Sequence, residues 1–304
     1  MFLLNVFIKE LDKNDKVFKK KWIRNFLQKI IIKFTEMTNN FFILNIDEEN
    51  KIFILPNIGK EDTYINIIKK IKSNKSKRKI DLILSKSVKK YDKYLKGVRI
   101  LDGRNILIDN IENIIKIIIG NIPIEIIDLY ILANNYTQTN VNFIKNISTK
   151  VKSVNLITNQ IEKYKILEEM LLEEGIAISI SNNKRKSLKN AKFIIDLDFD
   201  KDDIVKYNIN RNACIINLSH ETIMDNVHGF EGVIIKSIDM NISESNKKML
   251  KDNNIYDEFE KIDLYEAIKE EKTNIEITEL YGCNGKINEK ELLNVRKILT
   301  NSEN

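Results

Sequence analysis

Short apolar runs alternate with polar stretches of helical length between residues 125 and 240. Runs this apolar are typical of parallel strands, because a parallel sheet is covered by helices on both faces. We therefore expect an open α/β sheet with six parallel strands. The predicted strands are Ile127–Leu132, Val154–Thr158, Ala177–Ser181, Phe193–Asp198, Ala213–Leu218 and Val233–Ile238.

The stretches between these runs place apolar residues three and four positions apart, which is the spacing of an amphipathic helix. They predict helices over Asn140–Ile147, Gln160–Glu174 and Asp202–Tyr207, with a short turn near 186–190. Gly175 follows the longest of these helices, where glycine is a common terminator because it adopts a left-handed backbone without steric cost. These helices are expected to cover the two faces of the sheet.

The N-terminal part of the chain shows strand and helix periodicities as well, and it predicts a smaller α/β domain ahead of the regular sheet. The predicted elements are a strand over 2–8, a helix over 16–36, a hairpin of Phe41–Ile46 and Lys51–Leu55, a helix over Thr63–Ile71, a strand over Ile80–Leu84, a helix capped by Ser85 or Ser87 that runs through Leu95, and a strand over Gly97–Leu101.

A long apolar helix over Ile106–Ile119 is expected to connect the two domains. The residues after 245 show mainly helical spacing, which is clearest in Glu289–Leu299. A chain of 304 residues is long enough for two domains. The predicted division is a basic N-terminal α/β domain at 1–104, a connecting helix at 105–124, a Rossmann-like sheet domain at 125–244 and a C-terminal helical segment at 245–304.

Charge is divided unevenly along the chain. The net charge of the whole chain is +6, but residues 1–104 carry +13 and the remainder carries −7. A basic half attracts phosphate-bearing ligands or nucleic acid, docks on acidic parts of the same chain, or simply faces solvent. The stretch from Lys72 to Arg104 holds 12 Lys and Arg with Tyr91 and Tyr94 among them, a composition that suits single-stranded nucleic acid and a solvated helix face alike.

The positions of the cysteines and the hydropathy of the chain indicate the cellular compartment in which the protein is expected. Cys214 lies in an apolar run and Cys283 in a glycine-rich turn, so the two predict no disulfide framework. The apolar start of the chain meets Lys9 and Glu10 at once, unlike a signal peptide. No apolar run approaches the ~20 residues of a membrane span. We expect a cytoplasmic protein without a membrane partner.

Ligands of open parallel sheets bind outside the carboxyl ends of the strands, at the point where the strand order reverses. The turns that follow the predicted strands are rich in amides, hydroxyls and carboxylates, so a nucleotide or another small polar molecule is the expected ligand. These turns are Asn134–Asn140, Thr158–Gln160, Asn182–Arg185, Asp198–Asp200 and Ser219–Glu221.

The first of these turns, Ala133–Asn140, contains no glycine. Dinucleotide-binding sheets carry glycines there, because the backbone must approach a pyrophosphate closely. A helix N-terminus nevertheless attracts anions through its free N–H groups and its dipole, and Thr137 or Thr139 can cap this one. Two interpretations stay open: a scaffold without a cofactor, or phosphate binding by Asn134, Thr137 and Thr139.

The second turn carries a resemblance to a known family. The strand before it lacks the acidic residue that would bind the ribose 2′-hydroxyl of NAD. Asn159 and the pair Glu162–Lys163 are similar to the Asn-Arg-Thr turn and following helix of the shikimate dehydrogenase and glutamyl-tRNA reductase group, although Gln160 and Ile161 replace the arginine and threonine.

The resemblance to that group covers residues 125–240, where Ala191–Asp196 and Ala213–Ser219 resemble its fourth and fifth strands. It implies a Rossmann-like NAD(P)-binding fold. It also implies that NADP rather than NAD is the candidate cofactor, with Asn159 and Gln160 at the adenosine ribose, if a cofactor binds.

Asp198 ends one predicted strand and His220 follows another, and these two residues are the candidates for acid–base chemistry. A histidine beside the crevice would exchange protons near neutral pH. Asp198 belongs to a run of five aspartates between 196 and 203, which either bind Mg²⁺ or cap the next helix. The two histidines and two distant cysteines do not form a zinc pattern, and no metal site is predicted.

Together these patterns predict a Rossmann-like protein related to NAD(P)-dependent oxidoreductases, with a degenerate cofactor site and a binding or regulatory role. One alternative is an active NAD(P)-dependent oxidoreductase whose phosphate turn lacks glycine. The other is a nucleic-acid-binding module that uses the basic N-terminal half.

Overall fold

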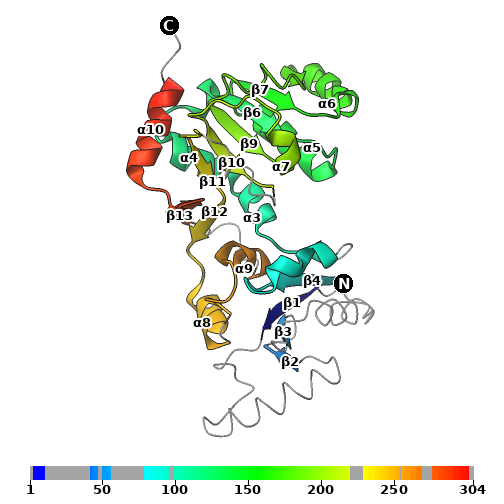
Figure 1. The fold of residues 1–304 in the computed structure, drawn as a ribbon, viewed down its shortest axis with the longest axis vertical. Coiled ribbons are helices and arrows are strands. Elements are labelled where there is room, and N and C mark those ends of the chain that lie inside the picture. Colours follow the sequence, from blue (N-terminus) through cyan, green and yellow to red (C-terminus); the bar gives the residue numbers. More distant parts are fainter. Residues whose placement is uncertain are drawn as a thin grey trace. The chain divides into compact units, whose positions relative to one another are not determined.

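The computed structural model describes residues 3–10, 42–46, 50–55, 79–95, 99–219, 229–253, 255–268 and 276–300. The chain forms two compact units, and each is assembled from two separate stretches of sequence (Figure 1). Unit 1 comprises Met1–Gly103 and Asn241–Ile275, and unit 2 comprises Arg104–Met240 and Glu276–Asn304. None of the described helices is long and apolar enough to cross a membrane.

Unit 2 is built on a six-stranded sheet in which every neighbouring pair is parallel, as predicted. The order across the sheet is β8-β7-β6-β9-β10-β11, so the chain first builds to one side of β6 and then returns to the other. This is the 3-2-1-4-5-6 order of a doubly wound, Rossmann-like sheet. The strands are β6 (Asp128–Leu132), β7 (Ser153–Ile157), β8 (Ile178–Ser181), β9 (Phe193–Asp196), β10 (Cys214–Asn217) and β11 (Val233–Ile235).

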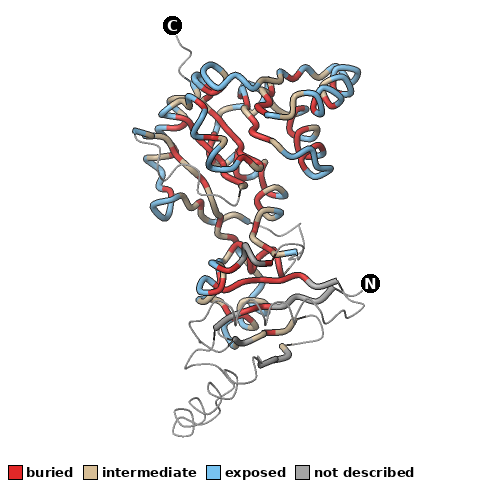
Figure 2. Tube along the Cα trace, turned by 45° about the vertical axis from the view of Figure 1, so that its right-hand side comes forward, coloured by how far each residue is buried: buried red, intermediate tan, exposed pale blue. Residues whose placement is uncertain are grey.

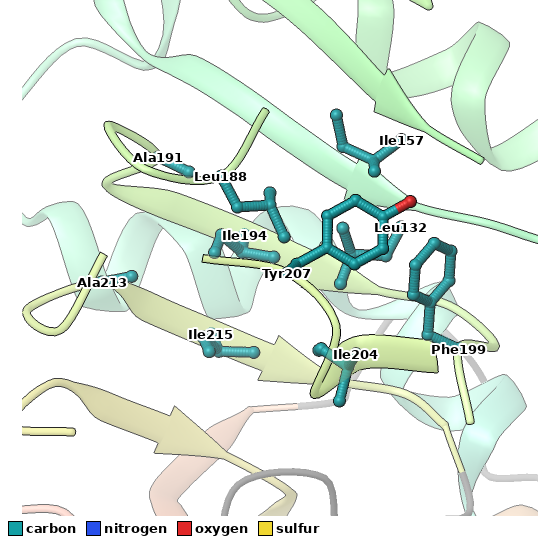
Figure 3. Packing of buried hydrophobic residues seen from close by; sticks show 10 residues of the cluster. All are labelled: Leu132, Ile157, Leu188, Ala191, Ile194, Phe199, Ile204, Tyr207, Ala213 and Ile215. Atoms are coloured by element: carbon teal, nitrogen blue, oxygen red, sulfur yellow. The ribbon is translucent and has the colours of Figure 1, made fainter. Parts of the chain in front are cut away.

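Both faces of this sheet are covered. Helices α5 (Gln138–Ser148) and α6 (Ile161–Glu173) connect β6 to β7 and β7 to β8. Since such crossovers are right-handed, both helices lie on one face, and the β8–β9 connection and α7 (Lys201–Ile204) lie on the other. On that second face one buried cluster joins four strands to the covering segments (Figure 3): Leu132, Ile157, Leu188, Ala191, Ile194, Phe199, Ile204, Tyr207, Ala213 and Ile215.

The rest of unit 2 packs helices and a small antiparallel sheet around the edge strand β11. Strands β12 (Ser237–Met240), β13 (Ile277–Gly282) and β14 (Gly285–Lys286) form that sheet. The Arg296 guanidinium donates to the carbonyls of Ile117 and Ile118 at 2.9 Å each, so it caps the last turn of α4. The remaining elements are α3 (Arg104–Asp109), α4 (Ile111–Ile119), η2 (Ile124–Ile126) and α10 (Glu289–Thr300).

Unit 1 contains a five-stranded sheet of order β2-β3-β1-β4-β5, parallel except for the β2–β3 hairpin. Its core combines Phe7 and Ile83 of the N-terminal sheet with Phe259 and Leu264 of the returning stretch, all of which are buried. Figure 2 colours the buried parts of the chain red. The elements are β1 (Leu3–Glu10), β2 (Phe42–Asn45), β3 (Asn50–Leu55), β4 (Lys79–Leu84), η1 (Lys89–Tyr94), β5 (Arg99–Ile100), α8 (Glu244–Asp252) and α9 (Lys261–Ile268).

The fold class agrees with the expectation of a Rossmann-like sheet and a smaller α/β unit, but three details differ. The apolar helix expected over 106–119 is two helices, which meet at Asn110. The segment 245–304, expected to be mainly helical, contains the β13–β14 hairpin, because β13 pairs with the distant β12. That segment is also shared between the two units rather than forming one body. The helices predicted over 16–36 and 63–71 lie outside the described residues.

Candidate functional site

The strand order of unit 2 reverses between β6 and β9, so the crevice of a doubly wound sheet opens at the carboxyl ends of these two strands. Residues 133–137 leave β6 there, and residues 197–200 leave β9. The parallel register pairs Leu132 with Asp196, which brings the two turns side by side. The structure thus brings Asn134 and Asp198, two predicted site residues, to the same point.

The Asp198 carboxylate closes the turn after β6. Its Oδ1 accepts the backbone N–H of Asn134 at 2.5 Å, and its Oδ2 accepts the backbone N–H of Asn135 at 3.0 Å. Oδ2 also accepts the side-chain amide of Asn140 at 2.7 Å. An ionised acceptor makes hydrogen bonds of this kind about twice as strong as neutral ones. The donors that would face a phosphate in this turn are therefore occupied by a carboxylate of the same chain.

The first turn is held from its other side by an amide, a tyrosine hydroxyl and the Arg104 guanidinium. The Asn140 amide also donates to the carbonyl of Asn135 at 2.8 Å, and the Tyr164 hydroxyl donates to that carbonyl at 2.8 Å. Arg104 donates to the Asn140 side-chain oxygen at 3.1 Å. The rings of Tyr136 and Tyr164 pack edge to face with their centroids 5.1 Å apart. Burial, with the nearby charge of Asp198, raises the pKa of Tyr164, so the hydroxyl stays a donor.

A second polar layer links this turn to the turns after β7 and β9. The Asn134 amide donates to Asp203 Oδ2 at 2.7 Å, and the Asn159 amide donates to the same oxygen at 3.1 Å. The Asn134 side-chain oxygen accepts the backbone N–H of Asn159 at 2.9 Å. The pair Asn134 and Asn159 thus bridges three strand ends, and Asp203 is the carboxylate that joins them.

Asp196 lies beneath this network and is completely buried at the end of β9. Its Oδ1 accepts the backbone N–H of Phe199 at 2.9 Å, while Oδ2 has no hydrogen-bond partner among the described residues. Burial, reinforced by the charge of Asp198, raises the pKa of Asp196 to about 8. The raised pKa favours the protonated form of this carboxyl at neutral pH.

The other predicted site residues have different settings. Thr137 caps α5, because its hydroxyl accepts the backbone N–H of Asn140 at 3.2 Å. Thr139 is exposed on the first turn of the same helix. The backbone N–H of Gln160 donates to Thr158 Oγ1 at 3.0 Å, and its Oε1 is buried without a hydrogen-bond partner in the described part of the chain. His220 lies outside the described residues.

Sequence reasoning did not assign Asp203, Tyr164 or Arg104 to the site. Asp203 belongs to the acidic run that the sequence singled out, so its type and position were a usable signal. Tyr164 and Arg104 gave none, because each is an ordinary helix residue until the fold brings it to the first turn. Asp200 caps α7 by accepting the backbone N–H of Asp203 at 2.7 Å, as the helix-cap alternative for the acidic run expects.

No group of three or more His, Cys, Asp and Glu side chains in the described residues is arranged to hold a metal ion. A cleft of about 610 Å³ in unit 2 lies between β11 and the β13–β14 hairpin, and none of the predicted site residues lines it.

Comparison with known proteins identifies no family. No protein-family model matches the chain, and no curated protein matches it. Among solved structures, ornithine carbamoyltransferase from Pyrococcus furiosus is 9% identical, with coverage of 88% of this chain and 83% of that one and a TM-score of 0.30. Shikimate dehydrogenase from Mycobacterium tuberculosis is 6% identical, with coverage of 77% and 86% and a TM-score of 0.31. Likenesses this weak support no argument about activity.

Proposed function

We propose that this chain is a Rossmann-like binding or regulatory protein whose dinucleotide site is closed by its own Asp198. The observation that carries the proposal is the pair of hydrogen bonds from the backbone N–H groups of Asn134 and Asn135 to that carboxylate. In dinucleotide-binding relatives of this fold, the first turn presents such groups to the pyrophosphate.

Charge makes the closure effective. A phosphate brought to the first turn would lie beside the carboxylate of Asp198, and Asp203 stands next to it through their shared contacts with Asn134. Two like charges about 4 Å apart repel by roughly 4 kcal/mol at the effective dielectric constant near a protein surface. That repulsion corresponds to about three orders of magnitude in affinity. NADP, which carries one more phosphate than NAD, is not favoured by this environment.

Calorimetric titration with NADPH and NADH tests the proposal directly. We expect no saturable heat for the unaltered protein at millimolar cofactor. Asp198→Ala removes the carboxylate that closes the first turn, and Asp198→Asn keeps the shape of the side chain but removes its charge. Binding that appears in Asp198→Ala, and also in Asp198→Asn because the repulsion is removed, would show that the charge of the carboxylate closes the turn. Binding in Asp198→Ala alone would assign the closure to the shape and hydrogen bonds of the side chain instead.

Saturable NADPH binding to the unaltered protein at micromolar concentration would overturn the proposal. It would favour the active oxidoreductase with a glycine-free phosphate turn. Asn142→Ala is a matched control, because Asn142 is exposed on the same helix and its side chain accepts a hydrogen bond from Gln138 rather than from the first turn.

A further inference from the structure

The connection from β8 to β9 is the most one-sidedly charged segment of unit 2. Residues 182–192 contain five Lys and Arg, and no Asp or Glu occurs between residues 175 and 195. The stretch 105–304, to which it belongs, carries a net charge of −7. A positive segment within an acidic half creates a local field that the overall composition conceals.

The structure separates the apolar and basic residues of this connection. Leu188 and Ala191 are buried in the core cluster of the sheet (Figure 3), and Lys184, Arg185, Lys186 and Lys189 are exposed. We call these four exposed cations and the backbone that carries them the basic loop. None of the four side chains forms an ion pair within the part of the chain that the structure describes.

The basic loop has a fixed backbone although it contains no helix. The Asn183 side-chain oxygen accepts the backbone N–H groups of Arg185 and Lys186 at 3.1 Å each. The hydroxyl groups of Ser181 and Ser187 are hydrogen-bonded at 2.7 Å, and this bond closes the base of the loop.

The loop is also tied to the segment after α7. The carbonyl of Lys184 accepts the backbone N–H of Asn208 at 2.8 Å, and that of Leu188 accepts the N–H of Asn210 at 3.0 Å. A partner therefore meets cations whose backbone is already ordered, which lowers the entropic cost of binding.

We propose that the basic loop binds the phosphate backbone of a nucleic acid duplex. Lysine and arginine, with asparagine amides between them, are the side chains that contact phosphate oxygens without reading sequence. The apolar residues of the loop are buried, so it lacks the exposed aromatic or aliphatic anchor of a protein interface. It also offers no exposed ring on which an unpaired base could stack. The site differs from the basic N-terminal half, and the inference does not depend on the state of the first turn.

Fluorescence anisotropy with a short labelled DNA duplex of arbitrary sequence, measured over a salt series, tests the inference. Neutralising four phosphates gives a slope of about −3.6 for log K against log salt, since each contributes roughly −0.9. The variant Lys184→Ser, Arg185→Ser, Lys186→Ser and Lys189→Ser should weaken binding at low salt by at least about tenfold and flatten the slope. Lys189→Ser alone should reduce the slope by about 0.9.

A matched control removes the same number of lysines and arginines elsewhere: Lys72→Ser, Lys75→Ser, Lys77→Ser and Arg78→Ser. If this control loses duplex binding and the loop variant keeps it, the loop is not the site. Absence of duplex binding by the unaltered protein overturns the proposal, as does salt-dependent binding to phosphatidylcholine–phosphatidylserine vesicles in its place. Circular dichroism of each variant separates loss of contact from loss of fold.

Discussion

At the scale of single residues, carboxylates decide the character of the crevice. Asp198 accepts hydrogen bonds from the backbone N–H groups of the first turn, and Asp203 accepts from the side-chain amides of Asn134 and Asn159. Asp196 is buried beneath them, and its pKa is raised. Asp196 ends β9, Asp198 follows two residues later and Asp203 lies in α7, so each carboxyl group has a different environment. Most polar groups at this edge of the sheet are thus hydrogen-bonded to one another.

Asp196 predicts a particular dependence of stability on pH. The pKa of its carboxyl is raised in the folded state to about 8 from an ordinary value of 3.8, so the folded protein holds a proton that the unfolded chain releases. Its contribution to stability is fully present below the unfolded pKa and is lost as the pH rises toward about 8. Asp196→Asn keeps the acceptor for Phe199 and removes the titration.

We therefore expect Asp196→Asn to be more stable than the unaltered protein at about pH 8, by on the order of 1–3 kcal/mol, with the difference shrinking toward about pH 5. Urea denaturation at several pH values measures it. The buried Asp263, whose pKa is raised to about 6 mainly by burial, titrates below most of this range and is unchanged in the variant. Superimposable pH profiles for the two proteins would contradict the assignment.

The sequence predicted the positions of these residues better than their roles. Asn134, Asn159 and Asp198 were placed at the crevice because each follows a predicted parallel strand. The capture of the first turn by Asp198 depends on the register of β9 against β6, which pairs Asp196 with Leu132. Periodicity within one strand does not encode that register, so the hydrogen bonds of Asp198 could not be predicted, and its assignment to catalysis stays a prediction.

At the scale of elements, short strands with a buried apolar pattern were the most predictable feature. All six strands of the unit 2 sheet occur where the apolar runs are. The hairpin after residue 276 was missed, because β13 shows no strict alternation of apolar and polar residues and gains its partner from β12, about forty residues earlier. Such long-range pairing leaves no local signal.

Gly232 provides a test of how closely two elements approach. A Cβ atom at this position would lie 2.0 Å from the carbonyl oxygen of Ala213, because Gly232 lies beside Ala213 where β11 begins its parallel pairing with β10. Gly232→Ala should destabilise the protein by about 2–4 kcal/mol, since the obstacle is backbone and cannot rotate away. Thermal denaturation measures the loss.

Gly175→Ala is the control for backbone conformation alone. Gly175 has a φ of 78° but nothing within 4 Å of an added Cβ, so its substitution should cost only about 1 kcal/mol. Equal losses of stability in the two variants would mean that the approach of Gly232 to Ala213 is not what constrains that position.

At the scale of the whole molecule, the two units share the chain in an interleaved way. Unit 1 begins the sequence, unit 2 follows, and residues 241–275 return to unit 1 before the chain ends in unit 2. A sequence pattern finds elements in chain order, and it therefore divided the protein at residue 104 and treated 245–304 as one segment. The return of residues 241–275 to unit 1 depends on which apolar faces pack against one another. A single sequence does not reveal that packing.

This interleaving predicts that residues 1–104 do not fold alone. The buried core of unit 1 contains Phe7, Ile52, Ile83 and Leu101, but its other members come from the returning stretch: Leu250, Ile255, Phe259, Leu264 and Ala267. A fragment of 1–104 lacks those apolar partners and should be unfolded by circular dichroism and rapidly digested by protease. Co-expression with 241–275 should restore protection. Cooperative thermal unfolding of the fragment by itself would contradict the shared core.

Asp198 has a consequence for how this site could change over time. A carboxylate carried by the same chain behaves as a tethered competitor, whose local concentration at Asn134 and Asn135 is fixed by loop geometry rather than by supply from solution. Dilution never removes it, and a free anion must always displace it. If the proposed closure holds, a single substitution at position 198 would leave these two backbone N–H groups open to an anion from solution, and selection could then act on the site again.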